Sequence, residues 1–230
     1  MKKVMALTVE SGREGQPADP IVYSIERENP DYIVFFVSEL SSKITMPRVL
    51  ERIGYTDDRY KEITCRDEND IISCFQLFRD TLRELLDKIS TVPQKMVVDY
   101  TTGTKAMSAA LVMAGINLQV GSINYVAGRR ENGIVVSGTE RVLPMRPIDI
   151  YWERLHDRVV ENFNKFRFQE SIESAEIMLK MTDESEKQRR AKFLFEISKG
   201  YQQWDIFQNE CAFKILTHVS NEDLQREYRC

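Results

Sequence analysis

The sequence has 230 residues, of which 42% are hydrophobic and 30% are charged, a composition typical of a soluble globular protein. Its formal net charge of −4 argues against a general nucleic-acid binder, because such proteins usually carry a basic field. No apolar run reaches the length that a membrane-spanning helix needs, and the four cysteines match no zinc pattern. We therefore expect a cytoplasmic protein with reduced thiols, with no metal site and no cofactor.

Short apolar runs alternate with helix-like segments over the first half of the chain. The run YIVFFV at 32–37 is continuously apolar and predicts a central strand buried on both faces, whereas the more polar 60–65 suits an edge strand. We predict strands over 3–9, 32–37, 60–65 and 96–98, helices over 20–29, 46–53 and 106–116, and a long amphipathic helix that Asp67 or Asn69 caps and that ends at Ile89.

Two more strands are expected after these, over 122–127 and 134–137. The loop between them contains Asn132 and Gly133, and an Asn-Gly pair is a strong hairpin signal. Alternating strands and helices followed by a hairpin predict an α/β fold, in which a mainly parallel sheet with an antiparallel edge lies between two layers of helices.

The remainder of the chain has the pattern of an all-helical segment. Pro144 and Pro147 mark the boundary, so we divide the chain into 1–145 and 146–230. Helices are expected over 148–164, 169–181, 184–201 and 205–219. The aromatic residues there recur at helical spacing and are interpreted as packing residues. Because no helix stop signal precedes the last residue, we expect the full protein to continue beyond it.

The stretch 95–116 carries the most informative pattern, in which a short buried strand, a Thr/Gly turn and a helix follow one another. This arrangement points backbone N–H groups at an anion. The positive charge of Lys105 in the first helical turn would favour a bound anion further. The alternative is that Thr102 or Thr104 is only an N-cap and Lys105 a solvated surface residue. The spacing fits neither a P-loop nor a dinucleotide-binding fingerprint.

The residues 99–107, DYTTGTKAM, resemble the D-x-T-G-G-T-K-x-M signature of CARF domains, the ligand-sensing domains of ancillary effectors in type III CRISPR immunity. The likeness extends over roughly 3–143 and is strongest at this motif. It implies a modified Rossmann fold, which agrees with the pattern of strands and helices. Thr102 stands in place of the usual first glycine, and a β-branched residue disfavours a left-handed backbone there.

Ligands of open α/β sheets bind beyond the C-terminal ends of the strands, at the point where the strand order reverses. With the usual doubly wound order, the loops after the first and fourth strands would share one crevice. For Arg13, a surface ion pair with Glu10 or Glu14 is the alternative to a ligand contact. The candidate ligand-binding residues are Glu10, Ser11, Gly12, Arg13, Ser38, Glu39, Thr101, Thr102, Gly103, Thr104, Lys105 and Met107, with Asn124 as a further candidate for a base contact.

CARF domains form homodimers that bind a cyclic oligoadenylate across their two-fold axis. The resemblance therefore implies that 1–145 senses cyclic tetra- or hexa-adenylate, and that 146–230 is a helical connector or dimerisation segment through which an antiviral effector is controlled allosterically. One alternative is a ring nuclease that cleaves its ligand, and another is a nucleic-acid-binding regulator. We expect no membrane and no direct DNA partner. The sequence assigns no catalytic residue and leaves open whether the chain is an enzyme.

Overall fold

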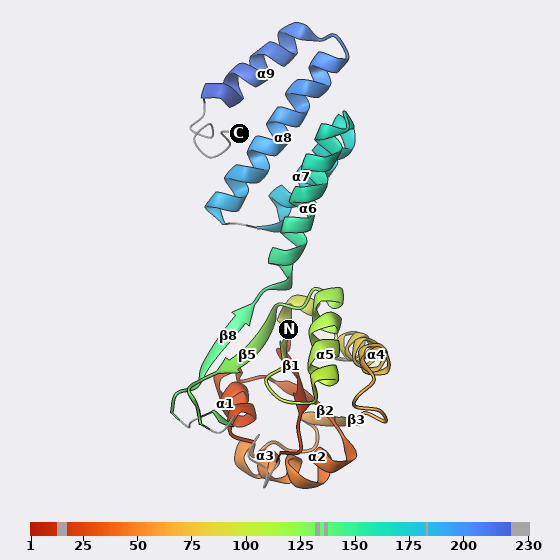
Figure 1. Ribbon diagram of the computed structural model, residues 1–230, viewed down its shortest axis with the longest axis vertical. Coiled ribbons are helices and arrows are strands. Elements are labelled where there is room, and N and C mark those ends of the chain that lie inside the picture. Colours follow the sequence, from red (N-terminus) through yellow and green to blue (C-terminus); the bar gives the residue numbers. More distant parts are fainter. Residues whose placement is uncertain (13–17, 132–133, 136–137, 183, 222–230) are drawn as a thin grey trace. The chain divides into compact units, whose positions relative to one another are not determined.

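The computed structural model describes residues 1–12, 18–131, 134–135, 138–182 and 184–221 (Figure 1). The chain forms two compact units, Met1–Pro147 and Ile148–Cys230. We describe each unit by itself.

The first unit is built on a six-stranded sheet with the order β3-β2-β1-β4-β5-β8. All neighbouring strands run parallel except β5 and β8, which are antiparallel. The mainly parallel α/β fold with an antiparallel edge is thus confirmed, and the first and fourth strands are neighbours. The strands are β1 (Val4–Val9), β2 (Tyr32–Val37), β3 (Tyr60–Thr64), β4 (Met96–Asp99), β5 (Ser122–Ala127) and β8 (Arg141–Met145).

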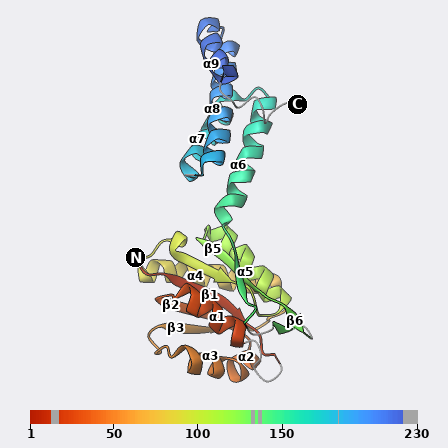
Figure 2. The same ribbon diagram turned by 90° about the vertical axis from the view of Figure 1, so that its left-hand side faces the viewer.

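Helices cover both faces of this sheet, because alternate residues of each central strand point to opposite sides. Val4 and Ala6 of β1 share one core with α4 (Ile71–Ile89) and α5 (Lys105–Leu118). Met5 and Leu7 share the other core with α1 (Ala18–Glu28) and α3 (Met46–Ile53). Figure 2 shows the sheet between α4 and α5 on one side and α3 on the other. The almost wholly buried β1 and β2 therefore lie inside the sheet, as strands covered on both faces require.

The antiparallel edge differs from the prediction in its partner strand. β5 pairs with β8, whereas β7 (Ile134–Val135) pairs only with β6 (Arg130–Glu131) in a separate two-stranded sheet. Pro144 lies inside β8 and so does not end the sheet. Proline is tolerated there because β8 is an edge strand, where a missing N–H need break no ladder hydrogen bond. The Asn132-Gly133 pair lies outside the described residues.

Local capping chemistry also corrects two details of the first unit. Asp70 caps α4, where we expected Asp67 or Asn69, and its carboxylate accepts a hydrogen bond from the Ile72 amide at 3.1 Å. The short helix α2 (Glu39–Ile44) was not expected. It begins because the side chains of Ser38 and Ser41 each accept from the backbone N–H of the other, which is a capping box. The 3₁₀ turn η1 (Pro93–Lys95) was also missed.

The second unit contains α6 (Pro147–Asn164), α7 (Phe168–Met181), α8 (Ser185–Asp205) and α9 (Asn209–Asn221). Its core includes Trp152, Val159, Met178 and Leu194, so the packing interpretation holds for Trp152. It is wrong for several other aromatic side chains, which lie at the surface. Their exposed fractions are 76% for Phe166, 59% for Trp204, 86% for Phe207 and 72% for Phe213.

Candidate functional site

The loop after β4 begins at a buried carboxyl group. One oxygen of Asp99 accepts a hydrogen bond from the Thr101 amide at 2.8 Å, and the other accepts from the Ser24 hydroxyl on α1. Asp99 is 3% exposed, and burial raises the pKa of its carboxyl above the usual range, against the opposing effect of these hydrogen bonds. The Thr101 hydroxyl in turn accepts from the Val126 amide at 2.8 Å. The start of the loop is therefore held by α1 and β5.

Thr102 and Thr8 exchange hydrogen bonds between the loop and the end of β1. The Thr102 hydroxyl donates to the Thr8 carbonyl at 2.5 Å, and the Thr8 hydroxyl donates to the Thr102 carbonyl. Thr102 is 6% exposed and is absent from the residues with positive φ. The threonine in place of the signature's first glycine therefore needs no left-handed backbone. Its hydroxyl binds the neighbouring strand, which sequence reasoning did not anticipate.

Gly103 is the residue of this loop with the left-handed backbone, at φ +101°. A Cβ atom built at Gly103 would lie 2.7 Å from the Thr8 Cβ, closer than carbon atoms of side chains approach. Glycine is required here for both reasons, the positive φ and the contact with β1. The loop after β4 is thus in direct contact with the C-terminal end of β1.

Thr104 is the N-cap of α5. The sequence-based alternative that Thr102 or Thr104 caps the helix therefore holds for Thr104 and not for Thr102. Its hydroxyl accepts from the Met107 amide at 3.1 Å and donates to the Glu68 carbonyl. Lys105 is exposed, and within the part of the chain that the structure describes its ammonium has no hydrogen bond or ion pair. The Lys105 and Ala106 amides likewise have no partner among the described residues. A cation and two N–H groups therefore remain available at the start of α5.

Thr45, the residue before α3, anchors the loop after β1. Its hydroxyl donates to the carbonyls of Glu10 at 2.8 Å and Ser11 at 3.0 Å. Gly12 has φ +51°, and Glu10 is exposed. Arg13 lies outside the described residues, so its choice between a ligand and an ion pair stays open.

The remaining candidates are used by the fold to different degrees. Ser38 caps α2, and Glu39 is exposed in the first turn of that helix. The Met107 side chain is fully buried in the core with α4. Asn124 is also fully buried, where its amide donates to the Glu28 carboxylate at 2.9 Å and accepts from the Ser122 hydroxyl at 2.6 Å. The side chains of Met107 and Asn124 are therefore structural, and a ligand contact by them is not expected.

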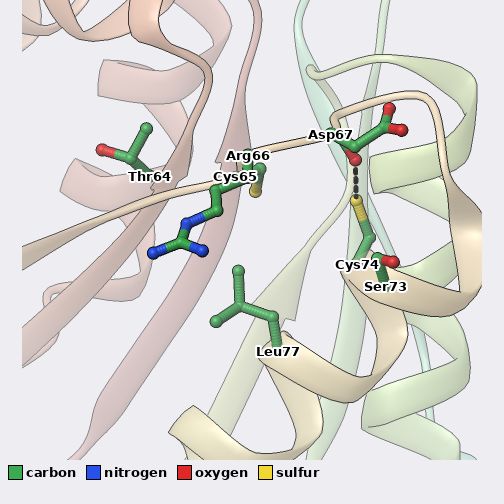
Figure 3. A pocket seen from close by; sticks show the side chains of 7 residues that line it. All are labelled: Thr64, Cys65, Arg66, Asp67, Ser73, Cys74 and Leu77. Atoms are coloured by element: carbon green, nitrogen blue, oxygen red, sulfur yellow. Dashed lines mark hydrogen bonds between the residues drawn. The ribbon is translucent and has the colours of Figure 1, made fainter.

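Sequence reasoning missed a cavity of about 410 Å³ between the end of β3 and the first turns of α4 (Figure 3). Its wall combines two thiols and Leu77 with hydroxyl and charged groups. The Cys74 thiol donates to the Asp67 carbonyl at 3.3 Å, and burial raises the pKa of Cys65 to about 12, which makes that thiol a poor nucleophile. The sequence held one signal for this cavity, because its residues follow a predicted parallel strand, where ligand sites of α/β sheets occur. The lining residues are Thr64, Cys65, Arg66, Asp67, Ser73, Cys74 and Leu77.

Two kinds of site are not found in the described residues. No group of three or more His, Cys, Asp or Glu side chains there could hold a metal ion. No helix among them is long and apolar enough to cross a bilayer.

The strand order, and the hydrogen bonds between the loop after β4 and the end of β1, define the class as a Rossmann-like α/β domain whose candidate site lies at the topological switch point. The structure is similar to two CARF-containing ancillary proteins of type III CRISPR systems. One is Enterococcus italicus Csm6 bound to cyclic hexa-2′-fluoro-hexa-dAMP, with a TM-score of 0.63 and 11% sequence identity over 88% of this chain and 55% of that one. The chain therefore spans little more than half of Csm6, and at this identity the likeness shows the fold.

The second is Sulfobacillus thermosulfidooxidans Can2 in complex with cyclic tetra-adenylate. Its TM-score is 0.41 at 11% identity, over 92% of this chain and 66% of that one, and we base no argument on it. Neither a protein-family model nor a curated protein matches the sequence.

Proposed function

We propose that this chain is a sensor that binds a cyclic oligoadenylate across a homodimer and controls an effector in type III CRISPR antiviral defence. The loop between β4 and α5 carries the proposal. Its turn is fixed to β1 by Thr102 and Gly103. It presents Lys105 and two backbone amides that have no partner within the described residues. The motif 99–107 and the Csm6-like fold support the same ligand class.

An anionic ring suits this loop for a physical reason. Lys105 in the first turn opposes the helix dipole, which costs about 0.3–1 kcal/mol, and a phosphate at that point reverses the sign of the interaction. The turn is already ordered by its hydrogen bonds, so little conformational entropy is lost when a ligand binds. A single chain offers few cations here, but a two-fold axis would present each loop twice to a ring that shares this symmetry.

The experiment is isothermal titration calorimetry of the full chain with cyclic tetra-adenylate and cyclic hexa-adenylate. We expect one ring per two chains. Lys105→Ala should weaken binding by about 1.5–3 kcal/mol, the contribution of a hydrogen bond to a charged group, without lowering thermal stability. Lys95→Ala is the matched control, because Lys95 is exposed at the opposite end of β4 and should leave affinity unchanged.

Failure of both rings to bind at micromolar concentration would refute the proposal. Equal losses in the two lysine variants would mean that only the general charge of the protein matters. Chromatography of the ring after incubation tests the ring-nuclease alternative, for which a cleaved product is required.

A further inference from the structure

A pair of stacked tyrosine rings lies beside the loop that leads into α5. Tyr100 directly follows β4, and its ring stacks on that of Tyr125 in β5, with 5.4 Å between the ring centroids and 24° between the ring planes. The Tyr100 amide donates to the Asn124 carbonyl at 3.2 Å, so the two tyrosines lie level with each other on neighbouring parallel strands. Because the loop 100–104 joins β4 to α5, the pair lies at the same end of the sheet as Lys105.

Both rings project from the face of the sheet on which α5 packs. Val98 of β4 and Ile123 of β5 belong to the core that α4 and α5 share, and side chains two residues apart on a strand lie on the same face. Tyr100 and Tyr125 each follow two residues later, so they lie on that face, where Tyr100 packs against the core. Both tyrosines are only partly buried, so part of this aromatic surface remains accessible.

The edge strand β8 extends this line of apolar side chains. Leu143 lies directly opposite Tyr125 in the antiparallel pair of β5 and β8, so the two side chains project from the same face. Leu143 is 44% exposed, and the face is therefore open to solvent at this edge. Arg141 shares the face, is exposed, and has no side-chain hydrogen bond or ion pair within the described part of the chain. We call Tyr100, Tyr125 and Leu143 the tyrosine row.

We propose that the tyrosine row stacks against an adenine base of the cyclic oligoadenylate whose phosphate binds at Lys105. This inference rests on the proposed function and names the residues that recognise the base. A nucleotide has a flat base and an anionic phosphate, and the chain places an aromatic surface beside a helix start that favours anions. Lys105 and Arg141 add positive charge near the row, which suits an anionic nucleotide better than an apolar peptide.

The burial of Asn124 supports the same assignment. Asn124 was the candidate for a base contact, but it is fully buried and its amide donates to Glu28 on the face where α1 packs. An adenine bound at the start of α5 therefore needs another partner. The tyrosine row is an exposed surface at that end of the sheet, and stacking requires no further polar side chain.

The experiment is isothermal titration calorimetry of the full chain with the preferred adenylate ring and with the ring of the same size in which uracil replaces adenine. Both rings carry the same phosphates, so the difference between their affinities reports on the base. Tyr125→Leu should weaken binding of the adenylate ring by about tenfold or more, and of the uridylate ring by about threefold or less, because uracil offers a smaller stacking surface. Tyr125→Phe keeps an aromatic ring and should stay within about twofold of the wild type.

Tyr60→Leu is the matched control for the loss of a ring. Tyr60 is also partly buried, and its ring contacts that of Phe35 with 6.0 Å between the centroids. It lies on β3, at the opposite edge of the sheet from β8, so its replacement should leave the affinity within about twofold. Tyr100→Leu provides a second variant of the row with the same expected loss as Tyr125→Leu. Circular dichroism with thermal melting verifies that each variant is folded.

The outcomes separate this inference from the proposed function. If neither adenylate ring binds the wild type, both are refuted. If a ring binds the wild type and folded Tyr125→Leu and Tyr100→Leu equally well, only the tyrosine row is refuted. Equal losses for the adenylate and uridylate rings would also overturn the row, because the variants would then act through the fold and not through the base.

Discussion

The turn before α5 and the turns of the helical hairpins α6–α7 and α8–α9 each contain a residue with a left-handed backbone, but they are held in different ways. At Gly103 the backbone is left-handed and so close to β1 that no side chain fits. At Phe166 and Phe207 the backbone is also left-handed, yet each carries a large exposed side chain. The first turn is held by side-chain hydrogen bonds to a neighbouring strand, and the others by backbone hydrogen bonds within the hairpin.

This difference indicates what each turn is built for. In the loop 100–104 the side-chain hydroxyls bind backbone groups of the protein. The groups without a partner in the described part of the chain are therefore the amides and the ammonium that follow this loop. The hairpin turns are held by backbone hydrogen bonds, and of the two turn side chains Phe166 makes an edge contact with the Phe168 ring. A left-handed non-glycine residue costs roughly 1–2 kcal/mol, and an exposed phenyl gains nothing from burial, so two such residues at equivalent positions are unfavourable for stability alone.

Gly103→Ala should produce the largest loss of stability. A small loss would contradict the difference drawn between the Gly103 turn and the hairpin turns. We expect the free energy of unfolding to fall by about 2–4 kcal/mol, because the added methyl group both strains the backbone and clashes with Thr8. Urea denaturation measures this change. Gly54→Ala is the control, since φ is +63° there but nothing lies within 4 Å of the added Cβ, and it should cost only about 1 kcal/mol. Equal losses would show that the contact with β1 is unimportant.

Asp99→Asn tests the cost of the buried carboxyl group that anchors the first turn. Because the pKa of Asp99 is raised in the folded state, the native protein holds more protons than the unfolded chain at pH values above about 3.8, the ordinary value. The contribution of Asp99 to the free energy of unfolding should therefore become less favourable as pH rises above about 4, and Asp99→Asn should remove this contribution from the pH profile. Urea denaturation at several pH values measures it.

Asp58→Asn provides the control for that experiment. The pKa of Asp58 is lowered, chiefly by its hydrogen bond with Thr56, so the stability it contributes is lost as pH falls. The two variants should change the pH dependence with opposite signs. A parallel pH profile for Asp99→Asn and the wild type would contradict the assignment.

Phe207→Gly should have the smallest effect and the opposite direction from Gly103→Ala. Relief of the left-handed strain exceeds the greater entropy of the unfolded glycine chain, so we expect a gain of about 0.5–1 kcal/mol in unfolding free energy. Thermal or urea denaturation would detect it. Phe166→Gly should gain less, because it also removes the edge contact between the Phe166 and Phe168 rings. A loss of more than about 1 kcal/mol would show that the phenyl ring packs against the hairpin.

Much of the fold could be predicted because its signals are local. The apolar run of β2 is long enough to identify a central strand, and α3 begins and ends where its sequence signals place it. The edge was harder, since a strong local turn signal at Asn132-Gly133 favoured the nearest strand as partner of β5. The actual partner β8 contains a proline and only partly buried or exposed side chains, and so has a weak strand signal.

For the candidate site, the sequence did not reveal which side chains the fold itself uses. The loop after β4 contacts the end of β1, the hydroxyls of Thr102 and Thr104 bind backbone groups, and Met107 and Asn124 are buried. Spacing in the sequence does not reveal this, because Thr8 and Thr102 are 94 residues apart. Which groups remain free for a ligand depends on which are used by such distant partners.

The amino-acid sequence alone determined the alternation of strands and helices, the motif at 99–107 and the helical second part, because each depends on residues close together in the chain. Only the tertiary structure decided that β5 pairs with β8, that Gly103 must approach Thr8, and that the Thr102 hydroxyl binds β1. Each of these depends on contacts between segments far apart in the sequence, where packing and hydrogen bonding choose among partners that local pattern leaves equivalent.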